Sequence, residues 1–501
     1  MDKRAFDGFR RSISSEFQAI YVVDLGGDSR EADNAGGDVF GNRIGSAILF
    51  LVRDPKLASN STRIAKILGA DPEDRLSALA SVSLGSSDFA LTPLNELGFW
   101  EPNEDASRVS ELRLVPAKLS GSVAEKSDKT IFGEASFGFV SNRDDWVIDR
   151  GRKNLERKVA RYLDVYSRVM ASLPAKLSEP ISTYLDYEIK WTEDLRKYAA
   201  RRKKITYDAS AIRPILYRPY GKRLHYHSND VNWSLYRLPK FFPNKLASNP
   251  SIYFSDRGSR APFTALGTDV PAELHLAAST DGFQGVSRYR YTESGERIDN
   301  ITDWAVAQFG AHYGDKAAIT KDAIFAYCYA VLHDPLYREK YALSLKREFP
   351  RIPFYDDFAQ WEAWGEALLK LHIDYEQATP FKLTRIDTPN PKRAKGTHPK
   401  PKLKSDAAAG LVVIDEDTQL TGIPPQVWTY RLGNRSAIDW VLDQHKEKTP
   451  RDPTIRAKFN TYRFADHKEE MIKLLAKVVT VSLATVAITD AMRALKRADD
   501  A

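Results

Sequence analysis

Apolar residues at helical spacing open the chain, and two apolar runs of strand length follow them. Residues 5–17 (AFDGFRRSISSEF) predict an amphipathic helix, because the apolar side chains of one stripe are Phe6, Phe9, Ile13 and Phe17. Residues 20–25 and 46–52 predict two strands, and the glycine-rich stretch between them gives a hairpin-like unit. The pattern then predicts helices at about 58–70 and 72–82, and this α/β part ends near residue 112.

The glycine-rich stretch does not have the pattern of a phosphate-binding loop. Such a loop needs a helix directly after it, because the free N–H groups of the helix N-terminus hold the phosphate. Here the apolar strand 46–52 follows the glycines, and neither G-x-G-x-x-G nor G-x-x-x-x-G-K-[ST] fits the stretch. We therefore expect a connection between strands and no nucleotide site.

The middle of the chain predicts one long helix and then short strands. Residues 151–175 place apolar residues at helical spacing among alternating charges, which favours an amphipathic scaffold helix. Residues 190–300 are rich in Pro, Gly, aromatic residues and short β runs, of which 251–254 and 273–277 are examples. Strands and loops should therefore dominate this part of the chain.

From residue 300 the pattern becomes helical, with segments at 301–313, 321–334, 335–349 and 356–375. Thr320 is a predicted N-cap. The tract 382–404 has eight basic residues, one acid and four prolines, which is typical first of a solvated loop or linker and second of a nucleic-acid tether. A β segment at 411–414 and two helices, at about 435–445 and 466–495, complete the pattern.

Composition places the chain among globular proteins. It has 501 residues, 43% of them hydrophobic, which suffices for about two to four domains. We expect a soluble cytoplasmic protein without membrane contact, because no run of about 18 apolar residues exists and the first residues lack the apolar stretch of a signal peptide. The single cysteine, Cys328, excludes a disulfide or a cysteine-ligated zinc site within the chain.

The positive charge of the chain is concentrated in one segment. The net charge is +7, but residues 190–260 hold 16 Lys and Arg against 5 Asp and Glu, or +11, while the remaining chain has 58 basic and 62 acidic residues. Basic and aromatic side chains alternate from residue 203 to residue 245. Cations neutralise phosphates and aromatic faces stack on bases, so the segment predicts a nucleic-acid surface on one face. The alternative is a β domain with an aromatic core and solvated cations at its edges.

Weaker patterns predict no catalytic or metal-binding residue. His225 and His227 lack a third ligand nearby. Ser136, within GEASFG, departs from a nucleophile elbow by one residue. Residues 186–190 fit half of a metal-dependent nuclease site, which needs a further acid on an adjoining strand.

Several motifs resemble a known family of DNA-modifying enzymes. Residues 5–53, a helix, a strand, a loop ending in VFG and a second strand, resemble the end of the catalytic domain in adenine-specific, amino-group DNA methyltransferases. The rest resembles the C-terminal specificity region of Type ISP restriction–modification enzymes, large polypeptides that join nuclease, helicase, methyltransferase and target-recognition parts. The matching pieces are 141–147 (SNRDDWV), 189–191 (IKW) with Asp194 and Leu195, 215–220 (ILYRPY), 301–305 (ITDWA), 327–333, 351–353 (RIP), 422–424 (GIP) and 435–440 (RSAIDW).

This resemblance implies a fold class and an order of domains. The fold is an α/β remnant of a Rossmann-like methyltransferase sheet, followed by a mixed α+β target-recognition region with a helical C-terminal part. The implied domains are the C-terminal portion of the methyltransferase core at 1–112, a β-rich target-recognition domain at 113–300, a helical subdomain at 301–380, a basic linker at 381–410 and a closing α+β segment at 411–501. The glycine-rich stretch then corresponds to the connection between the sixth strand and the antiparallel seventh strand.

The catalytic and cofactor motifs of the family are missing from this sequence. The family binds S-adenosylmethionine at a Gly-rich motif after its first strand, and an Asn-Pro-Pro-aromatic motif holds the flipped adenine. Residues 422–425 (GIPP) lack the amide and the aromatic residue, and 249–251 (NPS) lacks the second proline. The resemblance thus implies no cofactor bound by this chain, and a partner polypeptide or a preceding region that carries the rest of the methyltransferase.

The implied function is sequence-specific recognition of double-stranded DNA for an adenine-specific methyltransferase of a restriction–modification system. A stand-alone DNA-binding or decoy module without catalysis is the alternative. We expect nine residues on the DNA face: Arg218, Tyr220, Lys222, Arg223, Tyr226, Arg237, Lys240, Arg257 and Arg260. For Tyr220 and Tyr226, packing in the protein core is an equal alternative.

Overall fold

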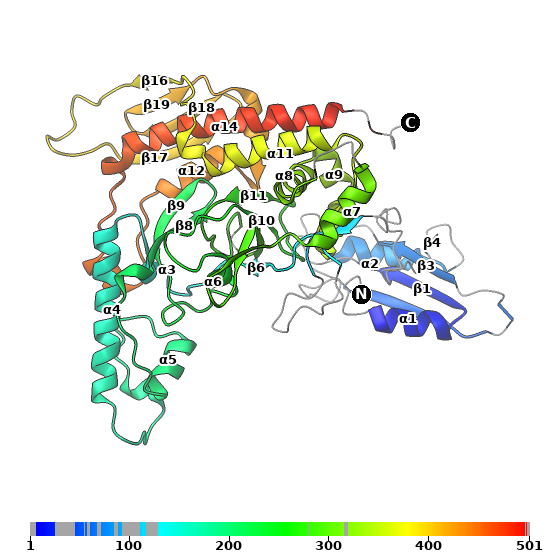
Figure 1. Cartoon of the computed structure of the whole chain (residues 1–501), viewed down its shortest axis with the longest axis horizontal. Coiled ribbons are helices and arrows are strands. Elements are labelled where there is room, and N and C mark those ends of the chain that lie inside the picture. The colour runs from blue at the N-terminus through cyan, green and yellow to red at the C-terminus, as the bar shows by residue number, and fades with distance from the viewer. Residues whose placement is uncertain are drawn as a thin grey trace. The chain divides into compact units, whose positions relative to one another are not determined.

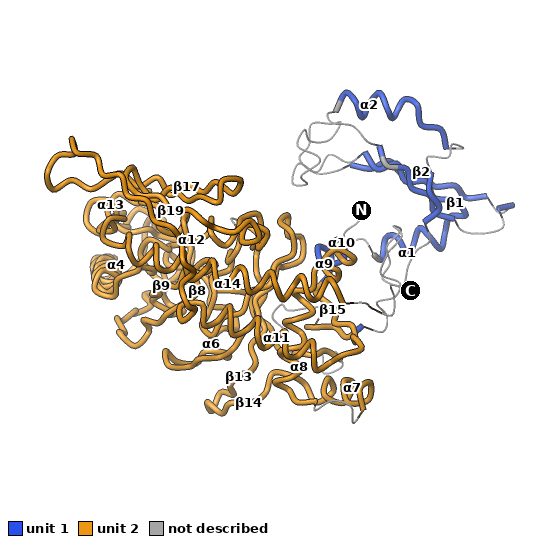
Figure 2. The backbone as a smooth tube through the Cα atoms, turned by 90° about the horizontal axis from the view of Figure 1, so that it is seen from above, with its two compact units in different colours: residues 1–111, 343–348 blue, residues 112–342, 349–501 orange. Residues whose placement is uncertain are grey.

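The computed structural model describes residues 7–25, 46–54, 56–57, 61–67, 72–84, 89–92, 111–116, 129–278, 280–314, 319–495 and 497. The chain forms two compact units (Figures 1 and 2). Unit 1 comprises residues 1–111 and 343–348, and unit 2 comprises residues 112–342 and 349–501.

Unit 1 has a four-stranded sheet in the order β2-β1-β3-β4. Its elements are α1 (Asp7–Glu16), β1 (Ala19–Asp24), β2 (Ala47–Val52), β3 (Ser61–Lys66), α2 (Pro72–Ala80) and β4 (Ala90–Leu91). Alternate residues of β1 serve two cores: Ile20 and Val22 pack with Ile13 of α1, whereas Val23 packs with Leu79 of α2. Since successive side chains of a strand point to opposite faces, α1 and α2 cover opposite faces of the sheet.

The structure confirms the hairpin-like pair and corrects one helix of unit 1. Strands β1 and β2 are antiparallel, as predicted, and α1 and α2 confirm two predicted helices. The helix predicted at 58–70 is wrong, because residues 61–66 form β3, parallel to β1. Hydrogen bonds to a neighbouring strand outweigh the local helical pattern here. The glycine-rich connection 26–45 lies outside the described residues.

Small antiparallel sheets organise the first half of unit 2. The main sheet has the order β11-β10-β12-β6. Its strands are β10 (Ser251–Ser255), β11 (Ala265–Thr268), β12 (Phe283–Ser287) and β6 (Ser136–Phe137). A second sheet contains β7 (Ile148–Asp149), β9 (Gly221–Tyr226) and β8 (Ile212–Arg218), and a hairpin joins β13 (Tyr289–Tyr291) to β14 (Arg297–Asp299). The strand predicted at 251–254 is confirmed, but that at 273–277 is wrong, because only 272–273 form bridges and 274–277 turn.

Helix α4 (Arg152–Ser172) confirms the predicted scaffold helix. The short helices around it are α3 (Asp144–Val147), α5 (Glu193–Ala200) and α6 (Leu238–Phe241). The guanidinium of Arg143, which is fully buried, lies 2.6 Å from the Asp194 carboxylate and holds α5 to the start of α3. The Trp146 Nε1–H donates to Asp452, the N-cap of α13 (Pro453–Lys458), at 2.8 Å. This region is thus tied to the C-terminal part of the chain.

The helical part of unit 2 is built around two packed helices, α8 (Lys321–Val331) and α11 (Phe358–Ile373). Thr320 caps α8 as predicted, with its side chain accepting from the Ala323 N–H. The other helices of this part are α7 (Asp303–Tyr313) and α9 (Pro335–Lys340), and α10 (Ala342–Arg347), which follows α9, falls almost wholly in unit 1. The single helix predicted at 335–349 is therefore interrupted, and β15 (Arg351–Ile352) after it pairs with β5 (Leu112–Arg113).

The C-terminal part of unit 2 contains a four-stranded sheet in the order β16-β19-β18-β17. Its strands are β16 (Thr384–Asp387), β17 (Pro401–Asp406), β18 (Leu411–Asp415) and β19 (Thr418–Thr421). The loop predicted at 382–404 is wrong at both ends, which form β16 and part of β17. Within the tract Arg393 lies 3.1 Å from Glu416, so its charge is used inside the sheet region. A short pair, β20 (Arg431–Leu432) and β21 (Arg435–Ser436), leads into α12 (Ala437–His445).

The last helix, α14 (Lys468–Ala494), is the core helix of unit 2. The stretch Phe464–Ala494 has a mean hydropathy of 1.9 in its most apolar window and is long enough to cross a membrane. The sequence pattern predicted a helix here but not this apolar character. Half of that window is buried inside the protein, where α14 packs against α11 and α12 (Figure 1). Its Thr485 hydroxyl lies 3.0 Å from Nε2 of the buried His372 on α11.

Candidate nucleic-acid interface

The residues predicted to contact DNA fall into three parts of unit 2. Five lie on the β8–β9 hairpin or its turn, two lie in the segment 227–246 after β9, and two lie in the loop after β10.

Tyr220 and Tyr226 are core side chains. They are 2% and 1% exposed, respectively. The Tyr220 hydroxyl lies 2.9 Å from that of Tyr430, and the Tyr226 hydroxyl accepts from the Asp208 N–H at 2.8 Å. Burial raises the pKa of both phenols, so both remain neutral. Core packing, the alternative that the sequence left open, describes both residues, and neither ring is available for stacking on a base.

The cations of the β8–β9 hairpin are used to hold the hairpin in place. The pairs are Arg218 with Glu273 at 2.5 Å, Lys222 with Glu376 at 3.0 Å, and Arg223 with the Gln444 carbonyl oxygen at 3.1 Å. Burial lowers the pKa of Arg223 to about 9. Burial also acts against the charge of Arg218, but Glu273, Tyr217 and Asp144 together outweigh it and raise the pKa of Arg218. DNA contact by these residues remains a prediction, and each cation already has a partner.

The two arginines of the loop after β10 lie at the surface. The side chain of Arg260 is 42% exposed and lies 3.0 Å from Asp281. The guanidinium of Arg257 lies 4.3 Å from the ring centre of Phe349. Both are held by neighbours on unit 2, and their contact with DNA likewise remains a prediction.

Arg237 and Lys240 lie beside a third cation that the sequence did not reveal. The Glu134 carboxylate lies 3.2 Å from Lys240, 3.2 Å from Arg290 and 3.8 Å from Arg237. Three positive side chains thus face one negative side chain, which leaves a net charge of +2 on these four residues. We call them the Glu134 cluster.

The Glu134 cluster joins segments that are far apart in the sequence. Glu134 precedes β6, Arg237 and Lys240 belong to segment 227–246, and Arg290 lies on β13, 156 residues from Glu134. Helix α6 packs against β13, and the Arg237 backbone N–H donates to Ser136 Oγ at 3.1 Å. These contacts make the three segments one continuous surface.

Segment 227–246 presents two aromatic side chains on a fixed frame. Val231, Leu235 and Leu238 point into the core, whereas Trp233 and Tyr236 are 43% and 45% exposed. A bridge between Ser234 and Val140 fixes the backbone between the two exposed rings.

Asn232 fixes the start of this frame. Its side-chain N–H groups donate to the carbonyl oxygens of Tyr226 and Ser228, and its Oδ1 lies 2.8 Å from Nε2 of His225. Burial lowers the pKa of His225 to about 4, so this histidine is neutral near pH 7. In the part of the chain that the structure describes, no group of three or more His, Cys, Asp and Glu side chains could hold a metal ion.

The backbone of Tyr236 is strained. Its φ is 48°, a left-handed conformation that costs a bulky residue about 1–3 kcal/mol and that clusters at functional sites. The ring of Tyr236 lies 5.2 Å from that of Phe137 on β6, which turns it toward the strand that follows Glu134. The strain thus directs an aromatic ring outward, next to the Glu134 cluster.

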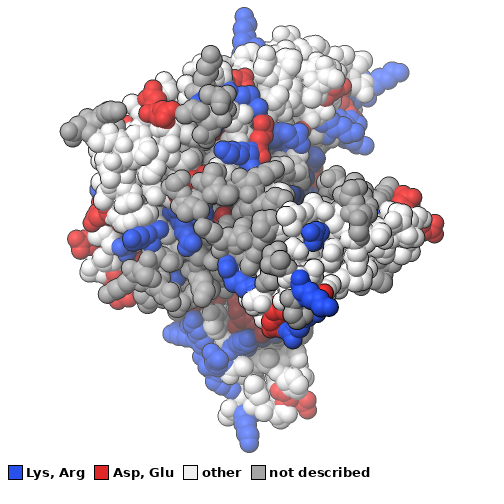
Figure 3. Space-filling model, turned by 90° about the vertical axis from the view of Figure 1, so that its right-hand side faces the viewer, with Lys and Arg blue, Asp and Glu red and all other residues white. Residues whose placement is uncertain are grey.

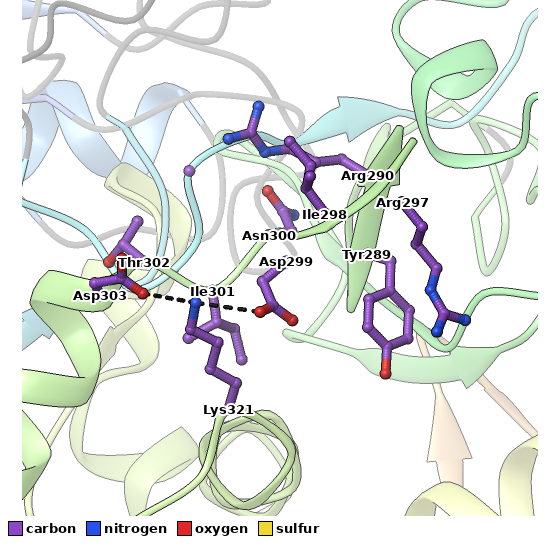
Figure 4. Close-up of a pocket in the computed structure, with 11 residues that line it drawn as sticks. Tyr289, Arg290, Arg297, Ile298, Asp299, Asn300, Ile301, Thr302, Asp303 and Lys321 are labelled. Carbon is purple, nitrogen blue, oxygen red and sulfur yellow. Dashed lines mark ion pairs between the residues drawn. The ribbon is translucent and has the colours of Figure 1, made fainter. Parts of the chain in front are cut away.

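A cavity of about 680 Å³ lies beside the β13–β14 hairpin (Figure 4). Lys321 of α8 lies between Asp299 and Asp303, at 3.2 and 2.7 Å. Figure 4 shows Arg290 pointing to the other side of the hairpin from Arg297. Arg290, Arg297 and Lys321 line it with Asp299 and Asp303, a net charge of +1, so this cavity attracts a polyanion less than the Glu134 cluster does.

Many cations of the basic segment lie close to acidic side chains. Figure 3 shows Lys and Arg in several separate areas of the face it draws, with Asp and Glu among them. Display of the excess of residues 190–260 on a single surface remains a prediction, and several of its cations pair with acids from other segments, which reduces the charge left for a polyanion. The part of the excess that faces Glu134 lies beside the exposed ring of Tyr236.

Comparison with known proteins identifies the chain where charge alone does not. The family model of the Type ISP C-terminal specificity domain matches residues 130–474. A comparison with curated proteins found no match.

Three solved structures resemble the chain over nearly its whole length. A DrdV–DNA complex is 37% identical, with a TM-score of 0.82 over 99% of this chain and 50% of that chain. A nuclease-deletion mutant of the Type ISP restriction–modification enzyme LlaGI, in complex with a DNA substrate mimic, is 25% identical, with a TM-score of 0.74 over 98% of this chain and 38% of that chain. The ATP-dependent Type ISP enzyme LlaBIII, bound to DNA, shares the fold at 22% identity and a TM-score of 0.73, over 98% of this chain and 32% of that chain.

The chain thus spans about half or less of the length of each solved relative. Its mixed α/β fold is that of the C-terminal region of these enzymes, and the resemblance seen in the sequence is confirmed. The chain belongs to the Type ISP restriction–modification enzymes and contains their C-terminal specificity domain.

Proposed function

We propose that this chain reads the DNA target for a Type ISP restriction–modification enzyme whose methyltransferase modifies the exocyclic amino group of adenine. The observation that carries the proposal is the 37% identity over 99% of the chain to a protein solved in complex with DNA. The LlaGI relative, solved with a DNA substrate mimic, supports it.

Unit 1 is proposed to be the last part of the methyltransferase core. Its strand β2 runs antiparallel beside the parallel pair β1 and β3. A reversed strand beside parallel strands is common in large α/β sheets, and this supports the Rossmann-like remnant implied by the sequence. The same assignment makes 26–45 the connection between the last two strands.

The remaining steps of methylation are assigned to a polypeptide segment that carries the missing motifs. This sequence has no Asn-Pro-Pro-aromatic motif and no Gly-rich turn from a strand to a helix, so nothing in it fits S-adenosylmethionine. Unit 2 would hold the duplex and present one adenine, because phosphate contacts position a protein on DNA and base contacts give specificity. This work would take place in the cytoplasm.

Binding selection from a random duplex library tests the recognition part of the proposal. The full chain should retain duplexes that share one short sequence, and its affinity should fall steeply as salt rises. Retention of no duplex, or of an unselected mixture with the same affinity for every sequence, would refute sequence-specific recognition.

Reconstitution tests the methyltransferase part. The chain is mixed with a polypeptide that carries the preceding region of a Type ISP methyltransferase, S-adenosylmethionine and the selected duplex. Methyl transfer to adenine N6 is the expected result, and the chain alone should transfer none. Selective binding that never supports methylation would favour the alternative, a stand-alone recognition or decoy module.

A further inference from the structure

We infer that the exposed rings of Trp233 and Tyr236 and the cations of the Glu134 cluster form one contact surface for duplex DNA. The cations would hold a backbone phosphate, and the two rings would lie against the edge of the adjoining groove. The inference rests on the proposed function and names the part of unit 2 that carries it.

The charge of the cluster fits a phosphate. One carboxylate faces three cations, and the pairing with Arg237 is loose at 3.8 Å. A Lys ammonium has three donors and an Arg guanidinium has five, so Glu134 leaves most of them unused. The side chains of Lys240 and Arg237 are 55% and 26% exposed, and a phosphate oxygen can reach both. Glu134 thus orients the cations without neutralising them.

The aromatic residues fit a groove edge and not a free base. Bases within a duplex are stacked, and a side chain reaches only their edges, the thymine methyl group and the sugars. Trp233 and Tyr236 offer amphipathic rings on a frame that the Ser234–Val140 bridge fixes before any partner arrives. A rigid ring costs little conformational entropy on binding.

The two halves of the surface lie next to each other. Phe137 contacts Tyr236 and follows Glu134 by three residues on the same segment. Arg237 is the neighbour of Tyr236 in the chain, and Lys240 lies one helical turn further on, in α6. A duplex that places a phosphate on the cluster therefore places the adjoining groove over the ring of Tyr236, and Trp233 lies three residues before it in the same segment.

The first experiment compares Lys240→Ala with a matched control, Lys458→Ala. Both lysines are 55% exposed, and each pairs with a glutamate that is 17% exposed, at 3.2 Å to Glu134 and 2.7 Å to Glu188. Affinity of the full chain for the selected duplex is measured by fluorescence anisotropy across a salt series. Loss of one phosphate contact reduces the salt slope by about 0.9, so the affinity of Lys240→Ala should fall about 3.5-fold less than that of the unmodified chain between 50 and 200 mM salt.

The expected result is a weaker, less salt-dependent Lys240→Ala variant and an unchanged Lys458→Ala variant. If Lys240→Ala kept the salt slope and the DNA affinity of the unmodified chain, the inference would be overturned. Equal losses of affinity in Lys240→Ala and Lys458→Ala would overturn it as well. If the unmodified chain binds no duplex, the proposed function is refuted. If the unmodified chain binds but Lys240→Ala binds equally well, only this inference is refuted.

Two further variants separate binding from folding. Glu134→Gln removes the counter-ion and keeps the shape, so DNA affinity should rise or hold even if the melting temperature falls; a loss of affinity would contradict the inference. Tyr236→Gly removes the ring and relieves the left-handed backbone, so affinity should fall several-fold while the melting temperature holds. Full affinity in a folded Tyr236→Gly variant would remove the aromatic half of the surface.

Discussion

The close approach of α8 and α11 makes Gly365→Ala a severe substitution. A Cβ at Gly365 on α11 would lie 1.8 Å from the carbonyl oxygen of Ala326 on α8 and 2.4 Å from its carbonyl carbon. Ordinary contact begins at 3.4 Å, so the helices would have to separate by about 1.6 Å. The obstacle is backbone, which cannot turn aside as a side chain can.

The cost follows from overpacking less a gain in helix propensity. Overpacking typically costs about 1–3 kcal/mol, and a clash with backbone lies at or beyond the upper end of that range. Replacing Gly by Ala within a helix returns about 1 kcal/mol. We therefore expect Gly365→Ala to lower the free energy of unfolding by about 2–3 kcal/mol.

Thermal and urea unfolding, followed by circular dichroism, measure this loss. Gly310→Ala is the control, because Gly310 lies within α7 and a Cβ there would meet nothing within 4 Å. The control should gain about 1 kcal/mol. A Gly365→Ala variant as stable as the unmodified chain would refute the close packing of α8 on α11, and a destabilised control would refute the reasoning from propensity.

Three further outcomes are expected. Arg143→Ala should cost about 3 kcal/mol in urea unfolding, since it leaves the Asp194 carboxylate without its buried partner; a loss below about 1 kcal/mol would contradict this. Arg223→Ala should lower the melting temperature and leave the salt slope of DNA binding unchanged, because its guanidinium is buried; a reduced slope would place it on the DNA face after all. The hydrogen bond from Arg161 lowers the pKa of Glu188 from 4.5 to about 2, so this carboxylate stabilises the fold above pH 4.5 and its contribution is lost as the pH falls toward 2. Glu188→Gln should remove that part of the pH dependence of unfolding, and an unaltered profile would refute the assignment.

Local sequence patterns predicted most of the helices and the protein family, because helix periodicity and family motifs both depend on residues close together in the sequence. Helix α4 follows from apolar spacing, and α8 follows from Thr320 and the apolar run after it. The errors arose where a distant strand decides the structure. Residues 61–66 form strand β3 because they pair with β1. Residues 401–406 form strand β17 because they pair with β18.

The candidate site was only partly visible in the sequence for the same reason. The basic segment led to Arg237 and Lys240, but a count of charges does not tell which cations face solvent and which face an acid. Glu134 and Arg290 lie outside that segment and meet it only through the packing of β6 and β13. Trp233 and Tyr236 were visible only as aromatic residues of the basic segment, and their exposure was not.

The hydrogen bond from Trp146 to Asp452 has a consequence for biosynthesis. Its partners are 306 residues apart, so at about 5–20 residues per second a ribosome needs roughly 15–60 s after making the first to deliver the second. The core helix α14 emerges later still. Until then the early strands of unit 2 wait with unpaired apolar surface, which is the kind of nascent chain that chaperones bind. A product that stops before residue 452 should therefore lack this contact and be more open to proteolysis than the full chain.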